Sequence, residues 1–201
     1  MSTAVSRHTQ TDTRQLILRI AGQLLLTRSY LGLSFQDLAD RVGIRKASLY
    51  HHFASKEVLG VALVNASQNR FVRWTEDVAH LGPADQMLAY IRMFRDLIGA
   101  GDRVCPLGAL GGEWDCIEPE LKTAVRGFHQ TQIDWLTQVA GALPAASLSP
   151  PGATAAVAAA QWAAQVNAAC QGAMINARIH DDVNGFDLAL APLRSQLQAL
   201  R

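Results

Sequence analysis

Residues 34–57 read SFQDLADRVGIRKASLYHHFASKE, and this stretch decides the fold. Ser34 is a preferred helix N-cap, because its hydroxyl accepts a backbone N–H that the first turn leaves without a partner. Leu38 and Val42 repeat at the four-residue spacing that lines one buried face of a helix. Gly43 then supplies the backbone freedom that a tight turn between two helices needs. The pattern predicts a short helix that ends in a sharp turn.

A second short helix follows the turn and is basic at its start. Arg45 and Lys46 place two positive charges there, and Ala47 and Ser48 are small enough to let the backbone approach a polyanion. Two helices joined in this way form a helix-turn-helix, whose second helix enters the major groove of DNA. We expect the core of the stretch to consist of Leu38, Ala39, Leu49 and Phe53.

The spacing of these residues is similar to that of a known family. The matching pattern is Leu33-Ser34-x3-Leu38-Ala39-x2-Val42-Gly43-Ile44-x4-Leu49-Tyr50-x-His52-Phe53-x-Ser55-Lys56-Glu57. It resembles the DNA-binding domain of the TetR family of one-component transcriptional regulators. Arg45 and Ala47 depart from the family pattern, in which Ser and Gly are common at these positions, so the resemblance leaves the operator sequence open.

The resemblance also implies which side chains contact DNA. Those nearest the base edges are Gln36, Lys46, Ala47 and Tyr50, and those at phosphates are Ser34, Arg45, Ser48, Tyr50, His52 and Lys56, with His51 as a further candidate. Lys46 can donate to guanine O6 and N7, and Ala47 can touch a thymine methyl group. For His52, a solvent-exposed or helix-capping imidazole is the alternative interpretation.

Length and composition agree with a helical protein in two parts. A chain of 201 residues can bury a proper core, and alternating runs of Val, Ile and Thr are absent. We therefore expect an all-α fold of about nine helices. An N-terminal three-helix helix-turn-helix domain would occupy residues 1–54, and a C-terminal helical domain for ligand binding and dimerisation would occupy residues 55–201.

The formal net charge of +1 hides a split along the chain. Residues 1–60 carry eight Lys and Arg against four Asp and Glu, whereas the remaining 141 residues carry ten against thirteen. A basic start and an acidic remainder suit DNA contact at the N-terminal end, since counterion release from phosphates supplies much of the affinity. Chance scatter of surface charge is the alternative.

Apolar runs and cysteines indicate the compartment. No uninterrupted apolar run reaches the length of about 18 residues that a membrane span needs, and no charged-then-apolar leader opens the chain. The cysteines at 105, 116 and 170 are odd in number and lack a zinc-like CxxC spacing, so we expect free thiols. The sequence thus predicts a cytoplasmic protein with no cofactor, no metal and no membrane contact.

The rest of the chain divides at its Gly and Pro residues. Residues 1–11 are predicted to form a disordered polar arm that is solvated rather than bound in a minor groove. Helices are predicted at about 12–28, 35–42, 45–53, 56–80, 84–98, 119–143, 153–180 and 186–200, with a weakly helical glycine-rich stretch at 105–114 and a loop at 144–152. In the family that the chain resembles, the helix from about 56 joins the DNA-binding domain to the ligand-binding domain.

The helix predicted at Ala153–His180 consists mostly of alanine and other apolar residues. A helix that is apolar nearly all round must be covered on most sides. We expect it to form a four-helix homodimer interface together with Phe186–Leu200, two helices from each subunit. An ordinary core helix is the alternative.

The effector pocket is less explicit. Its candidate lining residues are Met93, Phe94, Leu97, Cys105, Leu110, Trp114, Phe128, His129, Gln132, Trp135, Trp162 and Met174, although such side chains more often form core than pocket. Polar side chains on apolar helices need a partner when buried, as with His129, Gln132, Asn167 and Gln171. For Asn167 and Gln171, a hydrogen bond across the dimer interface is the favoured interpretation.

Cys105 begins the run Cys-Pro-Leu-Gly-x-Leu-Gly-x-Glu. This run resembles a segment in a TetR subset that includes sensors of reactive electrophiles and oxidants, so Cys105 is a redox-sensing candidate. A nearby helix N-terminus and Arg103 would favour its thiolate, and Cys116 or Cys170 would be a resolving thiol. A small buried hydrophobe in a tight turn is the alternative.

Two other classes of function are weaker. No nucleophile–His–acid arrangement, HExxH or phosphate-binding glycine loop is present, and GALGG at 108–112 lacks both a preceding strand and the GxGxxG spacing. We therefore expect no enzyme. A ligand-independent structural DNA-binding protein would need a broadly basic C-terminal part, which the charge split argues against. The sequence predicts a repressor that a small apolar or thiol-reactive effector releases from a palindromic operator.

Overall fold

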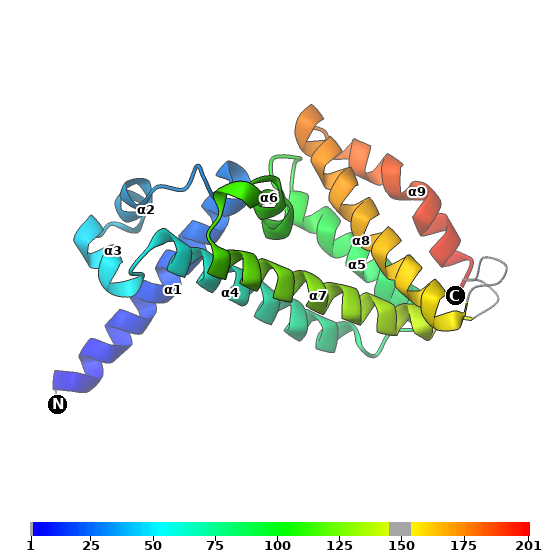
Figure 1. The fold of residues 1–201 in the computed structure, drawn as a ribbon, viewed down its shortest axis with the longest axis horizontal. Coiled ribbons are helices and arrows are strands. Elements are labelled where there is room, and N and C mark those ends of the chain that lie inside the picture. The colour runs from blue at the N-terminus through cyan, green and yellow to red at the C-terminus, as the bar shows by residue number, and fades with distance from the viewer. Residues whose placement is uncertain (1, 145–153) are drawn as a thin grey trace. The chain divides into compact units, whose positions relative to one another are not determined.

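The computed structural model describes residues 2–144 and 154–201, and side chains from Asp12 onward (Figure 1). In these ranges all regular structure is helical, which confirms the all-α expectation. The elements are α1 Ser2–Arg28, α2 Phe35–Val42, α3 Lys46–His52, α4 Lys56–Val78, α5 Pro83–Ile98, α6 Pro106–Gly112, the short 3-10 helix η1 Trp114–Cys116, α7 Pro119–Gly141, α8 Ala155–His180 and α9 Asn184–Gln198.

The N-terminal arm is the main departure from the predicted elements. α1 begins at Ser2 rather than near Asp12, so the prediction of a disordered arm at residues 1–11 is wrong. The physical reason is that residues 2–11 contain neither Gly nor Pro, so nothing stops the helix from extending towards the N-terminus. The predicted loop at 144–152 lies outside the described residues, apart from Pro144.

The chain forms two compact units. Unit 1 comprises Met1–Ser67 and Pro106–Arg126, and unit 2 comprises Gln68–Cys105 and Gly127–Arg201. Helices α4 and α7 each contribute residues to both units. The predicted functional division at residues 54 and 55 stays a prediction.

Unit 1 contains the helix-turn-helix. Its predicted core is confirmed, because Leu38, Ala39, Leu49 and Phe53 are all fully buried. The cap of α2 is also as predicted, since Ser34 Oγ accepts a hydrogen bond of 3.1 Å from the N–H of Asp37. Gly43 ends α2 with a φ of +78°, in the left-handed region that favours glycine, and its N–H donates to the carbonyl of Ala39.

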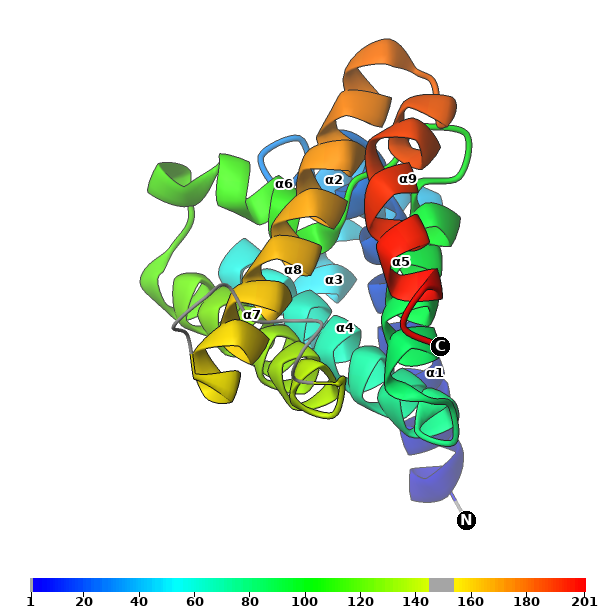
Figure 2. The same cartoon turned by 90° about the vertical axis from the view of Figure 1, so that its right-hand side faces the viewer.

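Unit 2 is built on α5, α8 and α9 with the C-terminal parts of α4 and α7. α8 and α9 lie side by side in both views of the ribbon (Figures 1 and 2). The buried face of α8 is dominated by alanines, which let neighbouring helices approach closely. Aromatic side chains from α4, α5 and α7 pack with ring centroids 5.0–6.3 Å apart: Phe71, Trp74, Tyr90, Phe94, Phe128 and Trp135.

Candidate nucleic-acid interface and effector site

The N-terminal end of α3 is exposed. Lys46 and Ala47 face solvent, as does Arg45 just before the helix, and Tyr50 is 48% exposed. Of the other predicted DNA contacts, Ser34, Gln36 and His51 are exposed, and Ser48, His52 and Lys56 are half-buried. Access to a duplex is therefore available along this face, and the contacts themselves stay predictions.

Neighbouring side chains hold this face in position. The Tyr50 ring lies against Phe35, with ring centroids 5.0 Å apart. The amide of Gln36 donates a 2.9 Å hydrogen bond to Asp40, which orients it along α2. Phe35 was missing from the predicted core, although it lies three residues before Leu38, at the spacing of the buried face of α2.

Lys56 has partners within its own unit. Its Nζ donates to the carbonyl of Leu31 at 3.3 Å and lies 4.6 Å from the centroid of the Tyr30 ring. Burial lowers the pKa of Lys56, and the charges of Glu118 and Glu113 offset part of that effect. These contacts give a structural reason for a lysine in the first turn of α4, where the helix dipole disfavours it, while phosphate contact stays a prediction.

A carboxylate distant in sequence holds the turn that follows α1. Glu113 accepts hydrogen bonds from the Ser29 hydroxyl at 2.7 Å, the Tyr30 N–H at 3.0 Å and the Leu31 N–H at 3.1 Å. Ser29 has a φ of +66°, a conformation unfavourable for a residue with a Cβ. Glu113 thus stabilises the connection between α1 and α2 by bonding to three consecutive residues.

Tyr30 adds a second link to the same segment. Its hydroxyl donates a 2.8 Å hydrogen bond to Glu118, which precedes α7. Burial first, then this bond and the neighbouring carboxylates, raise the pKa of Tyr30 well above its usual value, so the phenol keeps its proton. Sequence reasoning missed Tyr30, Glu113 and Glu118 as a group. The only local signal was the Glu that ends the Cys-Pro-Leu-Gly run.

Inside unit 2, a buried amide joins α8 to two other helices. Asn167 donates to Tyr90 Oη at 2.9 Å and to Gln132 Oε1 at 3.3 Å. Gln171 donates to Cys105 Sγ at 3.6 Å. Asn167 is buried and its amide finds both partners within the chain, so the interpretation that it bonds across a dimer interface is wrong. For the half-buried Gln171, that interpretation stays a prediction.

Cys105 is the last residue of the first segment of unit 2, just before α6. It is 3% exposed, and its backbone N–H donates to the thioether of Met174 at 2.7 Å. Arg103, expected to favour the thiolate, lies 3.9 Å from Asp102. Burial is the main effect that raises the pKa of Cys170, to about 12, so that thiol stays protonated at neutral pH. Cys116 is exposed.

The predicted pocket residues fall into different environments. Phe94, Cys105, Leu110, Phe128, Gln132, Trp162 and Met174 are buried, Met93, Leu97, Trp114 and Trp135 are half-buried, and His129 is exposed. The expectation that His129 needs a buried partner is wrong, since it faces solvent on α7. Leu110 and Trp114 belong to unit 1 and the others to unit 2. Their role in binding an effector stays a prediction.

Among the described residues, no group of three or more His, Cys, Asp or Glu is arranged to hold a metal ion. None of their helices is long and apolar enough to span a bilayer.

Residues 17–63 match the family model for bacterial regulatory proteins of the tetR family. The chain is 27% identical over 124 residues to the HTH-type transcriptional repressor NemR of Escherichia coli K12, and this match covers 60% of this chain and 58% of NemR. It is also 27% identical over 123 residues to the transcriptional regulator AcuR of Cereibacter sphaeroides, covering 58% of this chain and 56% of AcuR. The matches therefore span less than two thirds of these relatives.

Solved structures match more of the chain. A TetR-family regulator from Agrobacterium tumefaciens is 27% identical, with a TM-score of 0.82 over 95% of this chain and 98% of that one. The reduced form of E. coli NemR, at 24% identity, has a TM-score of 0.75 over 92% and 96%, which shows a shared fold.

Proposed function

We infer the function from the premise that this chain belongs to the TetR family of bacterial regulatory proteins. We propose that it is a cytoplasmic transcriptional repressor, in which two copies bind a palindromic operator and an effector releases them. The exposed basic end of α3, set on a fully buried Leu49, is the observation that carries the proposal. In a dimer, two such helices reach successive major grooves.

The exposed faces of α8 and α9 support the dimer. No charged side chain occurs in Ala155–Ala177, and the outer face of α8 carries Val157, Gln161, Ala164, Ala168, Gly172, Ile175 and Ile179. Ile179 is 67% exposed and Leu188 is 77% exposed. Large apolar side chains exposed on two adjacent helices suit an isologous contact, which removes them from water. Within the chain, Leu190, Leu193 and Leu197 are already buried, so the dimer would cover Leu188 rather than all the leucines of α9.

We propose that Cys105 is where a thiol-reactive effector acts. A quinone or an unsaturated aldehyde would accept the sulfur at carbon while a C=C π bond breaks, and the thiol proton would pass to the acceptor. The added group would displace Gln171 and Met174, which now contact Cys105. An apolar ligand that binds without reaction, pushing the same side chains apart, is the alternative.

Chain connectivity provides the route to the DNA-binding helices. Cys105 is followed directly by α6, and Glu113 lies immediately after that helix. A displaced Cys105 would shift α6 and with it the carboxylate that holds Ser29–Leu31. The effector then favours the conformation in which the two α3 helices no longer fit one operator, which is a shift between two populated states.

The test is DNA binding with and without an electrophile. Fragments of the source genome that the purified protein retains supply the operator, and fluorescence anisotropy measures its affinity. We expect acrolein, an unsaturated aldehyde, or benzoquinone to release DNA from the natural protein and from Cys116→Ser, whose thiol is exposed, but not from Cys105→Ser. If the Cys105→Ser variant releases DNA at the same dose of electrophile as the natural protein, the thiol mechanism is contradicted. A protein that retains no fragment at low salt contradicts the repressor itself.

The alternative function is a structural DNA-binding protein without an effector. It predicts binding to unrelated sequences with equal affinity at a given salt concentration. A ratio of specific to non-specific affinity well above one excludes it.

A further inference from the structure

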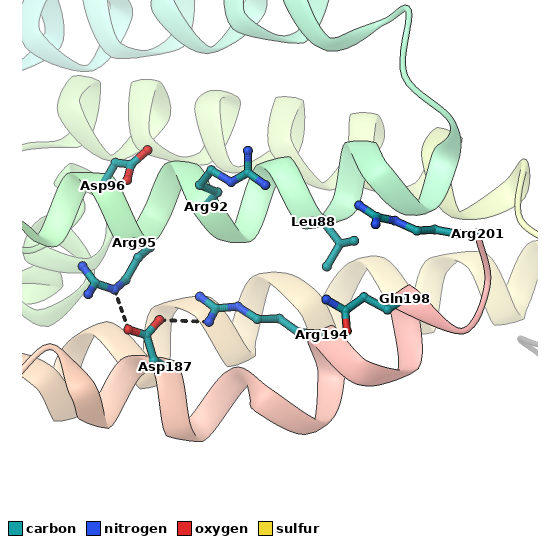
Figure 3. A pocket seen from close by; sticks show the side chains of 8 residues that line it. All are labelled: Leu88, Arg92, Arg95, Asp96, Asp187, Arg194, Gln198 and Arg201. Atoms are coloured by element: carbon teal, nitrogen blue, oxygen red, sulfur yellow. Dashed lines mark hydrogen bonds and ion pairs between the residues drawn. The ribbon is translucent and has the colours of Figure 1, made fainter.

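A groove of about 450 Å³ lies between α5 and α9, within unit 2 (Figure 3). It is lined by Leu88, Arg92, Arg95, Asp96, Asp187, Arg194, Gln198 and Arg201. None of these residues belongs to the predicted effector pocket. The lining holds four guanidinium groups and two carboxylates, so its chemistry is that of a site for anions.

Helix geometry explains why these side chains meet. On α5, the lining positions 88, 92 and 95 recur every three or four residues, and on α9 positions 187, 194 and 198 are seven and four residues apart, which are two turns and one turn of a helix. The apolar faces of the same helices are buried beside them, with Ile91 on α5 and Leu190 on α9. The groove therefore follows the solvent edge of an apolar helix contact.

Asp187 organises two of the arginines. Arg95 Nε lies 2.8 Å from Oδ2 and Arg194 Nη1 lies 2.9 Å from Oδ1, so both carboxylate oxygens are occupied (Figure 3). Partial burial alone would raise the pKa of Asp187, but the hydrogen bonds and charges of Arg95 and Arg194 outweigh it and lower the pKa. One carboxylate thus positions two guanidinium groups and neutralises one of them, and each group keeps further N–H donors.

The other two arginines differ in their partners. Arg201 pairs with Asp85 at the edge of the groove. Among the described residues, no carboxylate oxygen lies within 4.0 Å of the Arg92 guanidinium. When Asp85 is counted with Asp96 and Asp187, four positive charges face three negative ones. In the part of the chain that the structure describes, no side-chain hydrogen bond uses the five donors of Arg92.

We propose that this groove binds a small oxyanion of charge −2, with Arg92 as the principal donor and Arg95 and Arg194 beside it. Guanidinium groups pair with phosphate and carboxylate through two parallel hydrogen bonds, which a lysine cannot do. The half-buried Leu88 supplies an apolar wall for the carbon chain of a dicarboxylate. Inorganic phosphate and a four-carbon dicarboxylate share this chemistry.

The proposed dimer leaves the groove open. Successive residues of a helix project about 100° apart, so Leu188, which the proposed dimer would cover, points to a different side of α9 from Asp187. The inference does not rest on the repressor assignment, because anion binding is measured without DNA.

Calorimetric titration of the full chain with sodium phosphate, sodium succinate and sodium acetate, at one ionic strength set with chloride, tests the proposal. We expect phosphate or succinate to bind at one site per chain and acetate to bind at least tenfold more weakly. If only phosphate binds, the groove is a phosphate site. If only succinate binds, it is a dicarboxylate site. The proposal is contradicted if acetate binds as tightly as both dianions. It is also contradicted if titration with either dianion releases or absorbs no more heat than titration with sodium chloride.

Variants locate the site. Arg92→Gln should weaken binding about tenfold or more, since a hydrogen bond to a charged group is worth at least one such factor. Arg201→Gln serves as a second variant. Arg73→Gln removes an exposed charge from α4 in the same unit and should change the affinity less than twofold. Equal losses in Arg73→Gln and Arg92→Gln would show diffuse charge attraction and overturn the groove as the site. Circular dichroism checks that each variant is folded.

Discussion

Replacing Glu113 should weaken the helix-turn-helix unit and separate effector binding from DNA release. The side chain accepts hydrogen bonds from Ser29, Tyr30 and Leu31, which all belong to the turn between α1 and α2. Glu113→Ala removes all three bonds. Glu113→Gln keeps one acceptor oxygen at nearly the same place but removes the charge.

The magnitude follows from these contacts. A hydrogen bond to a charged group contributes about 1.5–3 kcal/mol, and a neutral one about 1 kcal/mol. Because Glu113 is half-buried, water replaces part of what is lost. We therefore expect Glu113→Ala to lower the free energy of unfolding by about 2–3 kcal/mol and Glu113→Gln by about 1 kcal/mol. Against a total of about 5–15 kcal/mol, the first change is large enough to measure.

Urea unfolding followed by circular dichroism measures this effect, and Glu76→Ala is the matched control. Glu76 is an exposed carboxylate on α4 with no hydrogen bond or ion pair to the described residues. Its replacement should change stability by less than about 0.5 kcal/mol. In the DNA assay, Glu113→Gln should bind the operator within a few-fold of the natural protein and resist release by effector. Glu113 variants with the stability of the control, or with full effector response, would refute this reasoning.

Three further predictions concern other parts of the molecule. Lys46→Ala should weaken operator binding and relax sequence choice, whereas Lys56→Ala should weaken binding to cognate and scrambled DNA about equally. If both variants have the same ratio of cognate to scrambled affinity, the assignment of Lys46 to bases and Lys56 to phosphates is contradicted. Lys56→Ala should also lower thermal stability, because Lys56 contacts Leu31 and Tyr30. Leu188→Glu should convert the dimer to a monomer in sedimentation while Gln196→Glu, also on α9 and exposed, leaves it intact; a dimeric Leu188→Glu places the interface elsewhere. Asp187→Asn should lower stability at neutral pH. Because the lowered pKa of Asp187 stabilises the fold only while the carboxylate is charged, the difference from the natural protein should vanish as the pH falls below the ordinary aspartate pKa of 3.8 and through the lowered one. A difference in stability that persists at pH 2 would point to packing instead.

The helix-turn-helix could be predicted because its signals are local. Ser34 and Gly43 are within a few residues of the groups they cap, and Leu38 and Leu49 repeat at a period that the backbone imposes. Exposure of Lys46 follows from the same period. What the pattern omitted within this unit was Phe35, the support for Tyr50.

The orientation of α8 could not be predicted in the same way. In a helix that is rich in alanine and carries few charged residues, periodicity does not distinguish the face that packs inside the chain from the face left for a partner. Asn167 was therefore given a partner across the dimer interface, although Tyr90 lies beside it in the fold.

The amino-acid order alone determined the all-helical fold and the basic recognition helix, because hydrophobic periodicity, caps and turns act over a few residues. Tertiary structure alone brought Glu113 to Ser29, 84 positions away, and Arg95 to Asp187, 92 positions away. Such contacts depend on which helices pack together and at what rotation, and that is decided by the summed burial of whole helix faces.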